Sequence, residues 1–218
     1  NLVPKFFDET GTTYDGVVSY GTLGKDKYWK RKILEQISDG SSFLDLACGT
    51  GILTREIAGK FPSAKIVGID ITQSYLDVAR KNSNSCDNIS FILDDAEKFK
   101  MDSKFDYITA SYLPKYCDPE ILVKNCIVHL KPSGKIIFHD FTYPKNPVVR
   151  GLWNFFLTLL RLVGCFIPSW KDALIGLPKL IRRTEWLDNY SDVMKKSGLD
   201  VNSHYLTYGA SAILTGTK

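Results

Sequence analysis

Between residues 42 and 140 the sequence alternates short apolar runs with amphipathic segments of helical periodicity. Parallel strands need crossover connections that return over a face of the sheet, so this alternation predicts a mostly parallel sheet with helices on both faces. We therefore expect a doubly wound α/β fold. Its predicted strands are 42–47, 64–69, 89–93, 105–110 and 135–140, the last after a turn at 131–134; its helices are 52–60, 74–81 with Ser74 as N-cap, and 119–129.

The flanking segments extend this core without repeats or low-complexity tracts. A helix over 185–197 ends at Gly198, which suits a left-handed C-terminal cap. Strands over 199–206 and 210–215, joined near Gly209, predict an antiparallel hairpin that brings the sheet to seven strands. We expect one domain over 1–218: a lead-in over 1–40 with a helix at 27–37, the core over 42–140, a helical insertion over 141–183, and the closing helix and hairpin over 184–218.

The loop after the first predicted strand reads Asp45-Leu-Ala-Cys-Gly-Thr-Gly51. Gly49 and Gly51 remove side chains where the backbone passes close to a ligand, and the next helix presents free N–H groups at its start. A dinucleotide site would show a third small residue, G-x-G-x-x-G, but Thr54 occupies that position. The Asp45 carboxylate suits a different ligand, because it can hold the ammonium end of a cofactor that carries an amino acid.

Acidic residues also follow the next two strands. Asp70 closes the strand Val-Gly-Ile-Asp-Ile, where a carboxylate accepts both hydroxyls of a ribose. The third strand ends in Leu93-Asp94-Asp95-Ala96, where a carboxylate beside a small residue can bind an adenine amino group and admit the ring. Each feature alone also occurs as a tight turn or a strand-end cap. Their presence at three consecutive strand ends favours a nucleoside-bearing cofactor.

These motifs resemble those of the class I methyltransferases, and more narrowly those of the ubiquinone/menaquinone biosynthesis C-methyltransferases. The resemblance covers nearly the whole chain, and its most specific parts are the opening Phe7–Asp15, similar to the family's F-D-x-x-A-x-x-Y-D, and the segment Asp140–Pro144. Further matching segments are Tyr28–Lys30, Asp45–Gly51, Val67–Asp70, Asp95–Ala96, Leu130–Gly134, Ile181–Arg182 and Leu206–Gly209.

The resemblance implies an enzyme with a Rossmann-like fold that uses S-adenosyl-L-methionine to methylate a carbon of a quinol or phenolic ring, prenylated in this family. The family's cofactor contacts fall on Thr50, Asp70, Asp95, Ala96 and Ser111. With the residues chosen from the pattern, the expected cofactor set is Asp45, Gly49, Thr50, Gly51, Asp70, Ile71, Asp95, Ala96 and Ser111.

The chain departs from the family near the expected acceptor. The family's G-L-R-N is Tyr112–Lys115 here, its D-x-Y-x-Y-L is Asp172–Leu177 without the tyrosines, and its closing H-R-G is Leu214–Gly216. Two alternatives therefore stay open: a soluble small-molecule acceptor, and cofactor binding without catalysis. A nucleic-acid methyltransferase is disfavoured, because Ala110–Pro114 replaces the N/D-P-P-Y/F motif and the net charge of +4 is not a concentrated basic stripe.

Carbon methylation needs a base, or a cation that stabilises the ionised acceptor, near the fourth and fifth strand ends. The candidates are Tyr112, His139, Asp140 and Arg182, the last at the end of the insertion. Each has a structural alternative: Tyr112 as packing over the cofactor, His139 as a hydrogen-bonded strand-end residue, Asp140 as a loop cap, and Arg182 as a solvated charge. We expect no metal, because the other histidines and the five cysteines lack metal-ligand spacing.

The insertion over 141–183 is apolar and aromatic. A membrane-spanning helix needs about 20 apolar residues, and Arg161, Gly164 and Pro168 interrupt the run here. The remaining interpretations are a core-packing helix pair or, as we favour, a lid over an apolar acceptor. Cationic residues lie nearby, so we expect a cytoplasmic protein with a peripheral membrane contact through 150–183, and a homodimer is compatible with the sequence. These cations are Lys171, Lys179, Arg182 and Arg183.

Overall fold

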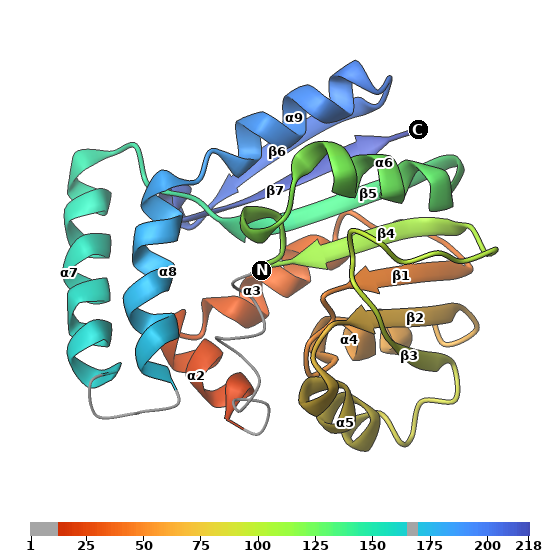
Figure 1. Ribbon diagram of the computed structural model, residues 1–218, viewed down its shortest axis with the longest axis horizontal. Helices are drawn as coiled ribbons and strands as arrows, with labels where there is room; N and C mark the ends of the chain where they lie inside the picture. Colours follow the sequence, from red (N-terminus) through yellow and green to blue (C-terminus); the bar gives the residue numbers. More distant parts are fainter. Residues whose placement is uncertain (1–12, 165–169) are drawn as a thin grey trace.

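The computed structural model describes residues 13–164 and 170–218, and a seven-stranded sheet forms its centre (Figure 1). The strand order is β3-β2-β1-β4-β5-β7-β6; β1 to β5 are parallel, and β7 is antiparallel to both of its neighbours. The predicted fold class is therefore confirmed. The strands are β1 (Ser42–Leu46), β2 (Lys65–Asp70), β3 (Ile89–Leu93), β4 (Phe105–Ser111), β5 (Leu130–Phe141), β6 (Asp200–Leu206) and β7 (Ser211–Thr217).

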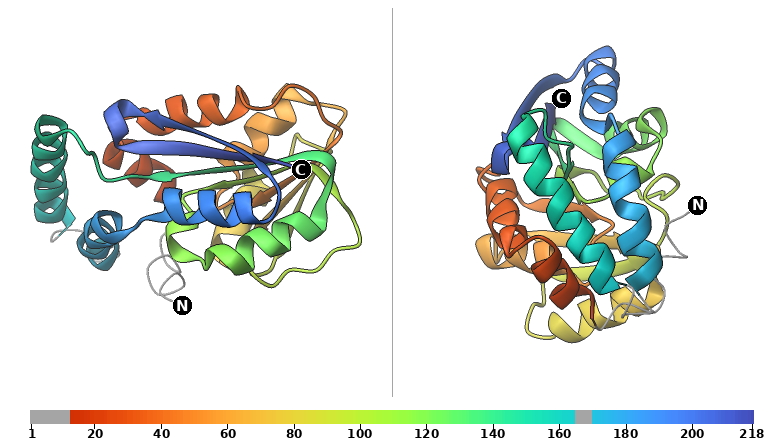
Figure 2. Two further views of the ribbon diagram at one scale, coloured as in Figure 1. Left: turned by 90° about the horizontal axis from the view of Figure 1, so that it is seen from above. Right: turned by 90° about the vertical axis from the view of Figure 1, so that its left-hand side faces the viewer.

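Helices cover both faces of the sheet, as the left view of Figure 2 shows. On one face, Trp29 and Ile57 from α3 and α4 pack with Phe43 of β1. On the other, Val123 and Tyr190 from α6 and α9 pack over the neighbouring strands. The helices are α2 (Tyr14–Gly21), α3 (Lys25–Leu34), α4 (Ile52–Lys60), α5 (Gln73–Asn82), α6 (Pro119–His129), α7 (Pro147–Gly164), α8 (Lys171–Arg183) and α9 (Trp186–Lys196), with short 3-10 turns at Pro114–Tyr116 and Thr207–Gly209.

The strand order reverses between β1 and β4. From β1 the chain moves outward to β2 and β3, and then crosses back to form β4 on the other side of β1. The connections after β1 and β4 lead to helices on opposite faces, so a crevice opens between them at the carboxyl ends of these strands. Both the glycine loop and the segment that contains Tyr112 border this crevice.

Most predicted helices and strands are confirmed to within a few residues. The predicted N-cap of α5, Ser74, is wrong. Its N-cap is Thr72, and Ser74 lies in the first turn of the helix. The physical reason is that Thr72 has extended backbone and its amide donates to the Asp70 carboxylate at 2.9 Å, which starts the helix earlier than expected. The lead-in contains two helices: α3, which corresponds to the helix predicted over 27–37, and before it α2, which the sequence did not predict.

The end of the chain follows the prediction closely. Gly198 has a φ of +82°, and its amide and that of Leu199 donate to the carbonyls of Lys195 and Met194 at 3.0 and 3.1 Å. This arrangement satisfies the last carbonyls of α9 and turns the chain into β6. The predicted turn at 131–134 lies inside β5 instead, as an irregularity where pairing passes from Phe105–Leu130 to Tyr107–Lys135.

The insertion forms two helices, α7 and α8, that lie side by side beyond the carboxyl ends of the parallel strands (Figures 1 and 2). The Trp186 indole, at the start of α9, donates to the Phe141 carbonyl at 2.7 Å, which ties the two ends of the insertion together. Among the described helices, none combines the length and the apolar character needed to cross a bilayer.

Gly68 in β2 provides a test of packing beneath the glycine loop. A Cβ on Gly68 would meet Phe91 Cδ1 at 2.8 Å and Cys48 Sγ at 2.9 Å. We expect Gly68→Ala to lower the free energy of unfolding by about 1–3 kcal/mol through overpacking, measured by urea denaturation. The control is Gly59→Ala in α4, where nothing lies within 4 Å. This control should instead gain about 0.5–1 kcal/mol, and equal effects at both sites would contradict the packing described.

Candidate active site

A cavity of about 430 Å³ lies between the crevice and the insertion. Its size is typical of a small-molecule site. The end nearest the sheet is lined by Gly49, Asp70, Ile71, Asp95, Ala96 and Ser111, all of which the sequence predicted as cofactor residues. The opposite end is aromatic and aliphatic, with Trp153, Phe156, Leu157 and Leu160 from α7 and Leu177 and Ile181 from α8.

The glycine loop is held at the end of β2. Asp70 accepts the Gly49 amide on Oδ2 at 2.8 Å, and the Cys48 amide donates to the Ile69 carbonyl at 2.9 Å. Gly49 and Gly51 have φ of +57° and +77°, which is the left-handed region that glycine adopts without strain. Gly51 is the N-cap of α4 and does not line the cavity, so its role here is to start the helix.

Asp70 is the buried carboxylate of the cavity wall. Its Oδ1 accepts the Thr72 amide and its Oδ2 the Gly49 amide, and the residue is 6% exposed. Burial raises its pKa, and the two amide hydrogen bonds act in the opposite direction. Each oxygen retains capacity for a further hydrogen bond, so the group fits a pair of hydroxyls, as a ribose would present.

Asp95 and Ala96 follow β3 on the same wall. Asp95 Oδ1 accepts the Glu97 amide at 2.9 Å, while Oδ2 pairs with the exposed Lys98 at 3.0 Å. Ala96 is 8% exposed and presents only a methyl group to the cavity. The pairing of a carboxylate with a small residue at this place fits an adenine ring, in line with the expectation from the sequence.

Asp45 lies in a smaller cavity of about 30 Å³ on the inner side of the glycine loop. Its two oxygens accept the hydroxyls of Thr54 and Thr109, each at 2.7 Å. Burial raises the pKa of the Asp45 carboxyl to about 6. Thr50 and Lys30 line the same small cavity, so Asp45 and Thr50 border the cofactor end without reaching the large cavity.

Tyr112 stands between the two cavities and lines both. Its φ of +66° is uncommon for a residue with a side chain, and such strain is concentrated at functional sites. The hydroxyl donates to Asp26 Oδ1 at 2.8 Å, and Asp26 also forms a buried ion pair with Lys30. The ring stacks on Phe141 with a centroid distance of 5.0 Å. Burial raises the pKa of Tyr112 well above its usual value, so the phenol stays protonated.

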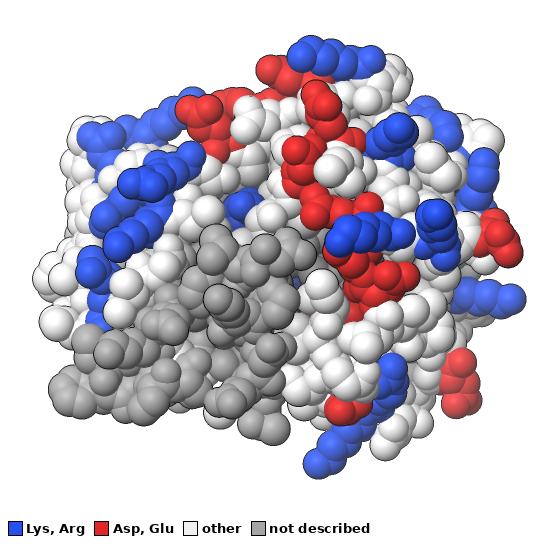
Figure 3. All heavy atoms as spheres, viewed as in Figure 1, with Lys and Arg blue, Asp and Glu red and all other residues white. Residues whose placement is uncertain are grey.

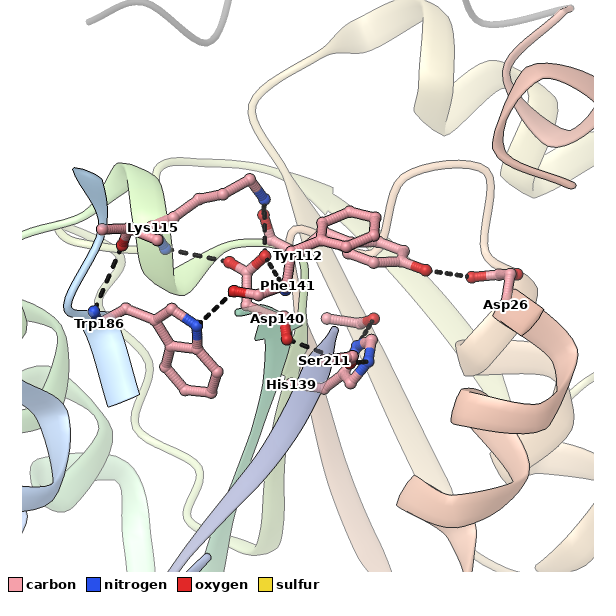
Figure 4. Close-up of polar contacts among 10 residues, drawn as sticks. Asp26, Tyr112, Lys115, His139, Asp140, Phe141, Trp186 and Ser211 are labelled. Atoms are coloured by element: carbon pink, nitrogen blue, oxygen red, sulfur yellow. Dashed lines mark hydrogen bonds and ion pairs between the residues drawn. The ribbon is translucent and has the colours of Figure 1, made fainter. Parts of the chain in front are cut away.

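His139 is fully buried between β4 and β7 (Figure 4). The Ser211 hydroxyl donates to the Asp140 carbonyl at 3.1 Å, and therefore accepts a hydrogen bond from His139 Nε2 at 2.7 Å. Nδ1 then accepts from the Ser111 hydroxyl at 2.9 Å. Burial lowers the pKa of this imidazole well below its usual value, so it is neutral and its second nitrogen is engaged. This geometry favours a role in holding Ser111; the role as a base stays a prediction.

Asp140 forms a buried ion pair with Lys115 (Figure 4). The two side chains are 0% and 1% exposed, and Lys115 Nζ lies 2.9 Å from Asp140 Oδ1. Nζ also donates to the Tyr112 carbonyl at 2.6 Å, and the Lys115 amide donates to Asp140 Oδ2 at 3.0 Å. Burial lowers the pKa of Lys115, whereas the nearby carboxylate raises it. Lys115, and not Asp140, belongs to the wall of the large cavity.

Lys115 is a candidate site residue that the sequence did not single out. In the sequence it stands only as a departure from the family's G-L-R-N segment, and the signal that could have found it is a lysine next to Tyr116 and three residues after Tyr112, just past a predicted strand. In the structure its ammonium lies over the Tyr116 ring at 4.3 Å from the centroid. It can donate three hydrogen bonds, and two are used within the chain. The pair Asp26–Lys30 was likewise not predicted.

Arg182 lies apart from the other predicted residues. Its Nη2 and Nε donate to Asn154 Oδ1 at 2.7 and 3.2 Å, which links α8 to α7. Among the described residues that line the large cavity, its neighbour Ile181 is present and Arg182 is not. Its catalytic role therefore stays a prediction that the geometry does not favour.

Known proteins match this chain over nearly its whole length. The model of the ubiE/COQ5 methyltransferase family matches residues 1–218. A ubiquinone/menaquinone biosynthesis C-methyltransferase UbiE from Hahella chejuensis is 29% identical over 99% of this chain and 91% of its own length. A demethylmenaquinone methyltransferase from Lactobacillus johnsonii is 28% identical over 100% of this chain and 95% of its own.

Solved structures resemble the fold at low identity. The N-methyltransferase NodS from Bradyrhizobium japonicum has a TM-score of 0.58 and 14% identity, over 88% of this chain and 96% of that one. The plantazolicin methyltransferase BpumL has a TM-score of 0.66 and 13% identity, over 95% of this chain and 88% of that one. These likenesses support the fold alone.

The raised pKa of Asp45 predicts a pH dependence of stability. Its pKa rises from 3.8 to about 6 on folding, so its contribution to stability is present at low pH and is lost as pH rises through about 6. The loss amounts to about 3 kcal/mol. Asp45→Asn removes it. We therefore expect the variant's free energy of unfolding, relative to the wild type, to rise by about that amount from acid to neutral pH.

Urea denaturation at a series of pH values, without cofactor, would measure this difference. Asp77→Asn on α5 controls for the loss of one negative charge, because that side chain is 64% exposed. A difference between the Asp45 variant and the wild type that stays constant with pH would contradict the buried environment of the carboxyl.

Proposed function

Because the chain belongs to the ubiE/COQ5 methyltransferase family, we propose that it methylates a ring carbon of a prenylated quinol or related phenol in quinone biosynthesis. Family membership makes the chain an S-adenosylmethionine-dependent methyltransferase. What we propose is the acceptor, a ring with a prenyl tail, because the names of the two relatives describe the acceptors of those proteins and not of this chain.

One observation carries the choice of acceptor. The same cavity reaches from Gly49 and Asp70 to an apolar wall that includes Trp153, Leu160 and Leu177. An aromatic ring held between these ends would lie beside the cofactor, with its tail against α7 and α8. Removing an isoprenoid tail from water is favourable at about 25 cal/mol per Å². A compact soluble phenol would leave this wall without a partner.

The residues at the polar end fit S-adenosylmethionine. When bound, this cofactor supplies a methyl group that is already activated by its positively charged sulfur. Asp70 has acceptor capacity for the ribose hydroxyls, and Gly49 lets the backbone approach closely. In the small cavity, Asp45 and Lys30 provide charges of opposite sign, which suit the ammonium and carboxylate of the cofactor's amino acid.

Lys115 provides the cation on the acceptor side. A ring carbon becomes nucleophilic when the neighbouring phenol ionises, and a fixed ammonium stabilises the phenolate oxygen. Lys115 lies on the cavity wall with one N–H donor not used by Asp140 or by the Tyr112 carbonyl. Its lowered pKa also makes it able to exchange a proton at lower pH than an exposed lysine.

Asp140 and Tyr112 act around this cation. Asp140 is a positioning residue, because it holds Nζ without itself lining the large cavity. Tyr112 lies between the small cavity and the large one, and Asp26 fixes its hydroxyl. A peripheral membrane contact through 150–183 completes the proposal, because cationic side chains accompany the apolar insertion.

A methylation assay with labelled cofactor tests the choice of acceptor. We expect transfer to demethylated quinols with prenyl tails and weaker transfer to the same rings without tails. Transfer to soluble phenols alone would assign the chain to the soluble-acceptor alternative. Tight cofactor binding with no transfer to any of these compounds would favour the non-catalytic alternative.

Replacing Asp70 tests the cofactor end. Asp70→Ala removes two hydroxyl acceptors and the anchor of the Gly49 amide, so we expect S-adenosylmethionine binding to weaken by about 10- to 100-fold. Isothermal titration calorimetry measures this, and a thermal melt checks that the variant folds. Asp77→Ala, on the exposed side of α5, is the matched control. Unchanged affinity in the Asp70 variant would remove the ribose assignment.

Replacing Lys115 tests the acceptor end. We expect Lys115→Gln to lower kcat by about 100-fold, the usual effect of losing one oxyanion donor, while cofactor affinity is unchanged. Lys124→Gln on α6, an exposed position, is the control.

The single variant leaves Asp140 buried without its partner, which costs about 3–5 kcal/mol. The double variant Lys115→Met/Asp140→Leu avoids this penalty, and we expect it to fold and bind cofactor without turnover. Wild-type kcat in the double variant would show that the pair serves packing alone.

A further inference from the structure

The large cavity and the small cavity of Asp45 share part of their walls. Among the described residues, those that line both cavities mark the boundary between the two. They are Tyr14, Ala47, Gly49, Ser111 and Tyr112. Two of these boundary residues are aromatic, and Tyr14 has no role in the site as described so far.

The sulfur of S-adenosylmethionine belongs at this boundary. It joins the nucleoside to the amino acid, and the residues proposed to hold these two parts lie in different cavities. Asp70 lines the large cavity, whereas Asp45 and Lys30 line the small one. A cofactor that extends into both cavities must therefore cross the boundary with its sulfur and methyl group. This placement rests on the cofactor contacts of the proposed function.

Tyr14 is held at the boundary through both of its neighbours in the sequence. Thr13, the N-cap of α2, accepts a hydrogen bond from the Trp170 indole at 3.0 Å. Asp15, in the first turn of α2, accepts the Thr50 hydroxyl at 2.5 Å. The start of α2 is thus tied to the start of α8 and to the glycine loop, and Tyr14 lies between these two anchors.

Other aromatic rings pack around the Tyr14 ring. The ring centroids of Tyr75 and Trp170 lie 5.0 and 6.1 Å from its centroid, and all three residues line the large cavity. A Cβ added to Gly49 would meet Tyr75 Cδ2 at 3.8 Å and Tyr14 Cε1 at 4.0 Å, which is ordinary van der Waals contact. A ligand group over this glycine would therefore touch both tyrosine rings.

The charges around Tyr14 suit a cation. Burial raises the pKa of its phenol well above the ordinary value, and the nearby Asp26 and Asp70 act in the same direction. The ring therefore stays neutral, and its face keeps the negative potential that attracts cations. Among the described side chains, the exposed cations of α8 lie toward its last turn, at the other end from Trp170. Figure 3 shows basic side chains over the upper parts of α7 and α8.

Tyr112, the other aromatic residue of the boundary, is a poorer match for a cation. The ammonium groups of Lys30 and Lys115 lie 5.4 and 5.7 Å from the centroid of its ring. Phe141 stacks on the same ring at 5.0 Å. Two positive charges of the chain itself therefore surround Tyr112, and they repel a further one.

We propose that the Tyr14 ring contacts the positively charged sulfur of bound S-adenosylmethionine and favours this charge through a cation–π interaction. Tyr75 and Trp170 are positioning residues, because they pack against the ring and Trp170 also holds the N-cap of α2. Since Trp170 directly precedes α8, one of the helices over the acceptor region also supports the residue at the sulfur.

Calorimetry with two ligands tests the proposal without any measurement of methyl transfer. S-adenosylhomocysteine lacks the methyl group and the positive charge, so the ratio of its dissociation constant to that of S-adenosylmethionine measures the preference for the charge. A change in packing alone would weaken both ligands alike. We expect Tyr14→Leu to lower this ratio by about tenfold, and Tyr14→Phe, which keeps a ring, to retain it. Tyr20→Leu, on the same helix and 82% exposed, is the matched control and should keep the wild-type ratio.

Pentafluorophenylalanine at position 14 provides a second variant, because it keeps the shape of a phenyl ring and reverses the potential of its face. It should lower the ratio as Tyr14→Leu does, and thermal melts identify any variant that fails to fold. A wild-type ratio in the folded variants that lack the native ring potential would overturn the proposal. Failure of the wild type to bind either ligand would instead overturn the cofactor contacts on which it rests, and Asp70→Ala tests those contacts separately.

Discussion

The hydrogen bond from the Gly49 amide to the Asp70 carboxylate joins the ends of β1 and β2, next to the reversal of strand order between β1 and β4. A parallel sheet gathers its carboxyl ends at one edge, and the reversal leaves that edge open between β1 and β4. The glycine loop and the Tyr112 segment border the opening from either side. Helices α7 and α8 of the insertion cover this opening, so the cofactor and acceptor regions become two ends of one cavity.

The parts of this arrangement that depend on local chemistry were predictable from the sequence. The bounds of α4 follow from a glycine N-cap and an amphipathic period. The cap at Gly198 follows from the residue type, because glycine adopts without strain the positive φ that the structure shows there. Asp70, Asp95 and Ala96 line the cavity because each lies at, or within three residues after, the carboxyl end of a parallel strand. The start of α5 differed because the Asp70 carboxylate holds the Thr72 amide two residues later, a local contact that competes with the predicted cap at Ser74.

The acceptor side depends on contacts between distant residues, which no local pattern reports. Lys115 meets Asp140 across 25 positions, and both side chains are enclosed only once β4, β5 and the insertion have packed. The exposure of apolar side chains such as Leu152 and Phe155 on α7 has the same origin. The sequence shows that this helix is apolar, but only the structure reveals which apolar residues line the cavity and which remain at the surface.

The two buried carboxylates at the cofactor end have a consequence for the charge of the ligand. Burial is the main cause of the raised pKa of Asp45, and the charge on Asp70 adds a smaller contribution in the same direction. A positively charged ligand relieves the repulsion between the two carboxylates, and methyl transfer removes one positive charge from the sulfur. By electrostatics alone, these two carboxylates favour a ligand with a positive charge on its sulfur over the same ligand without that charge.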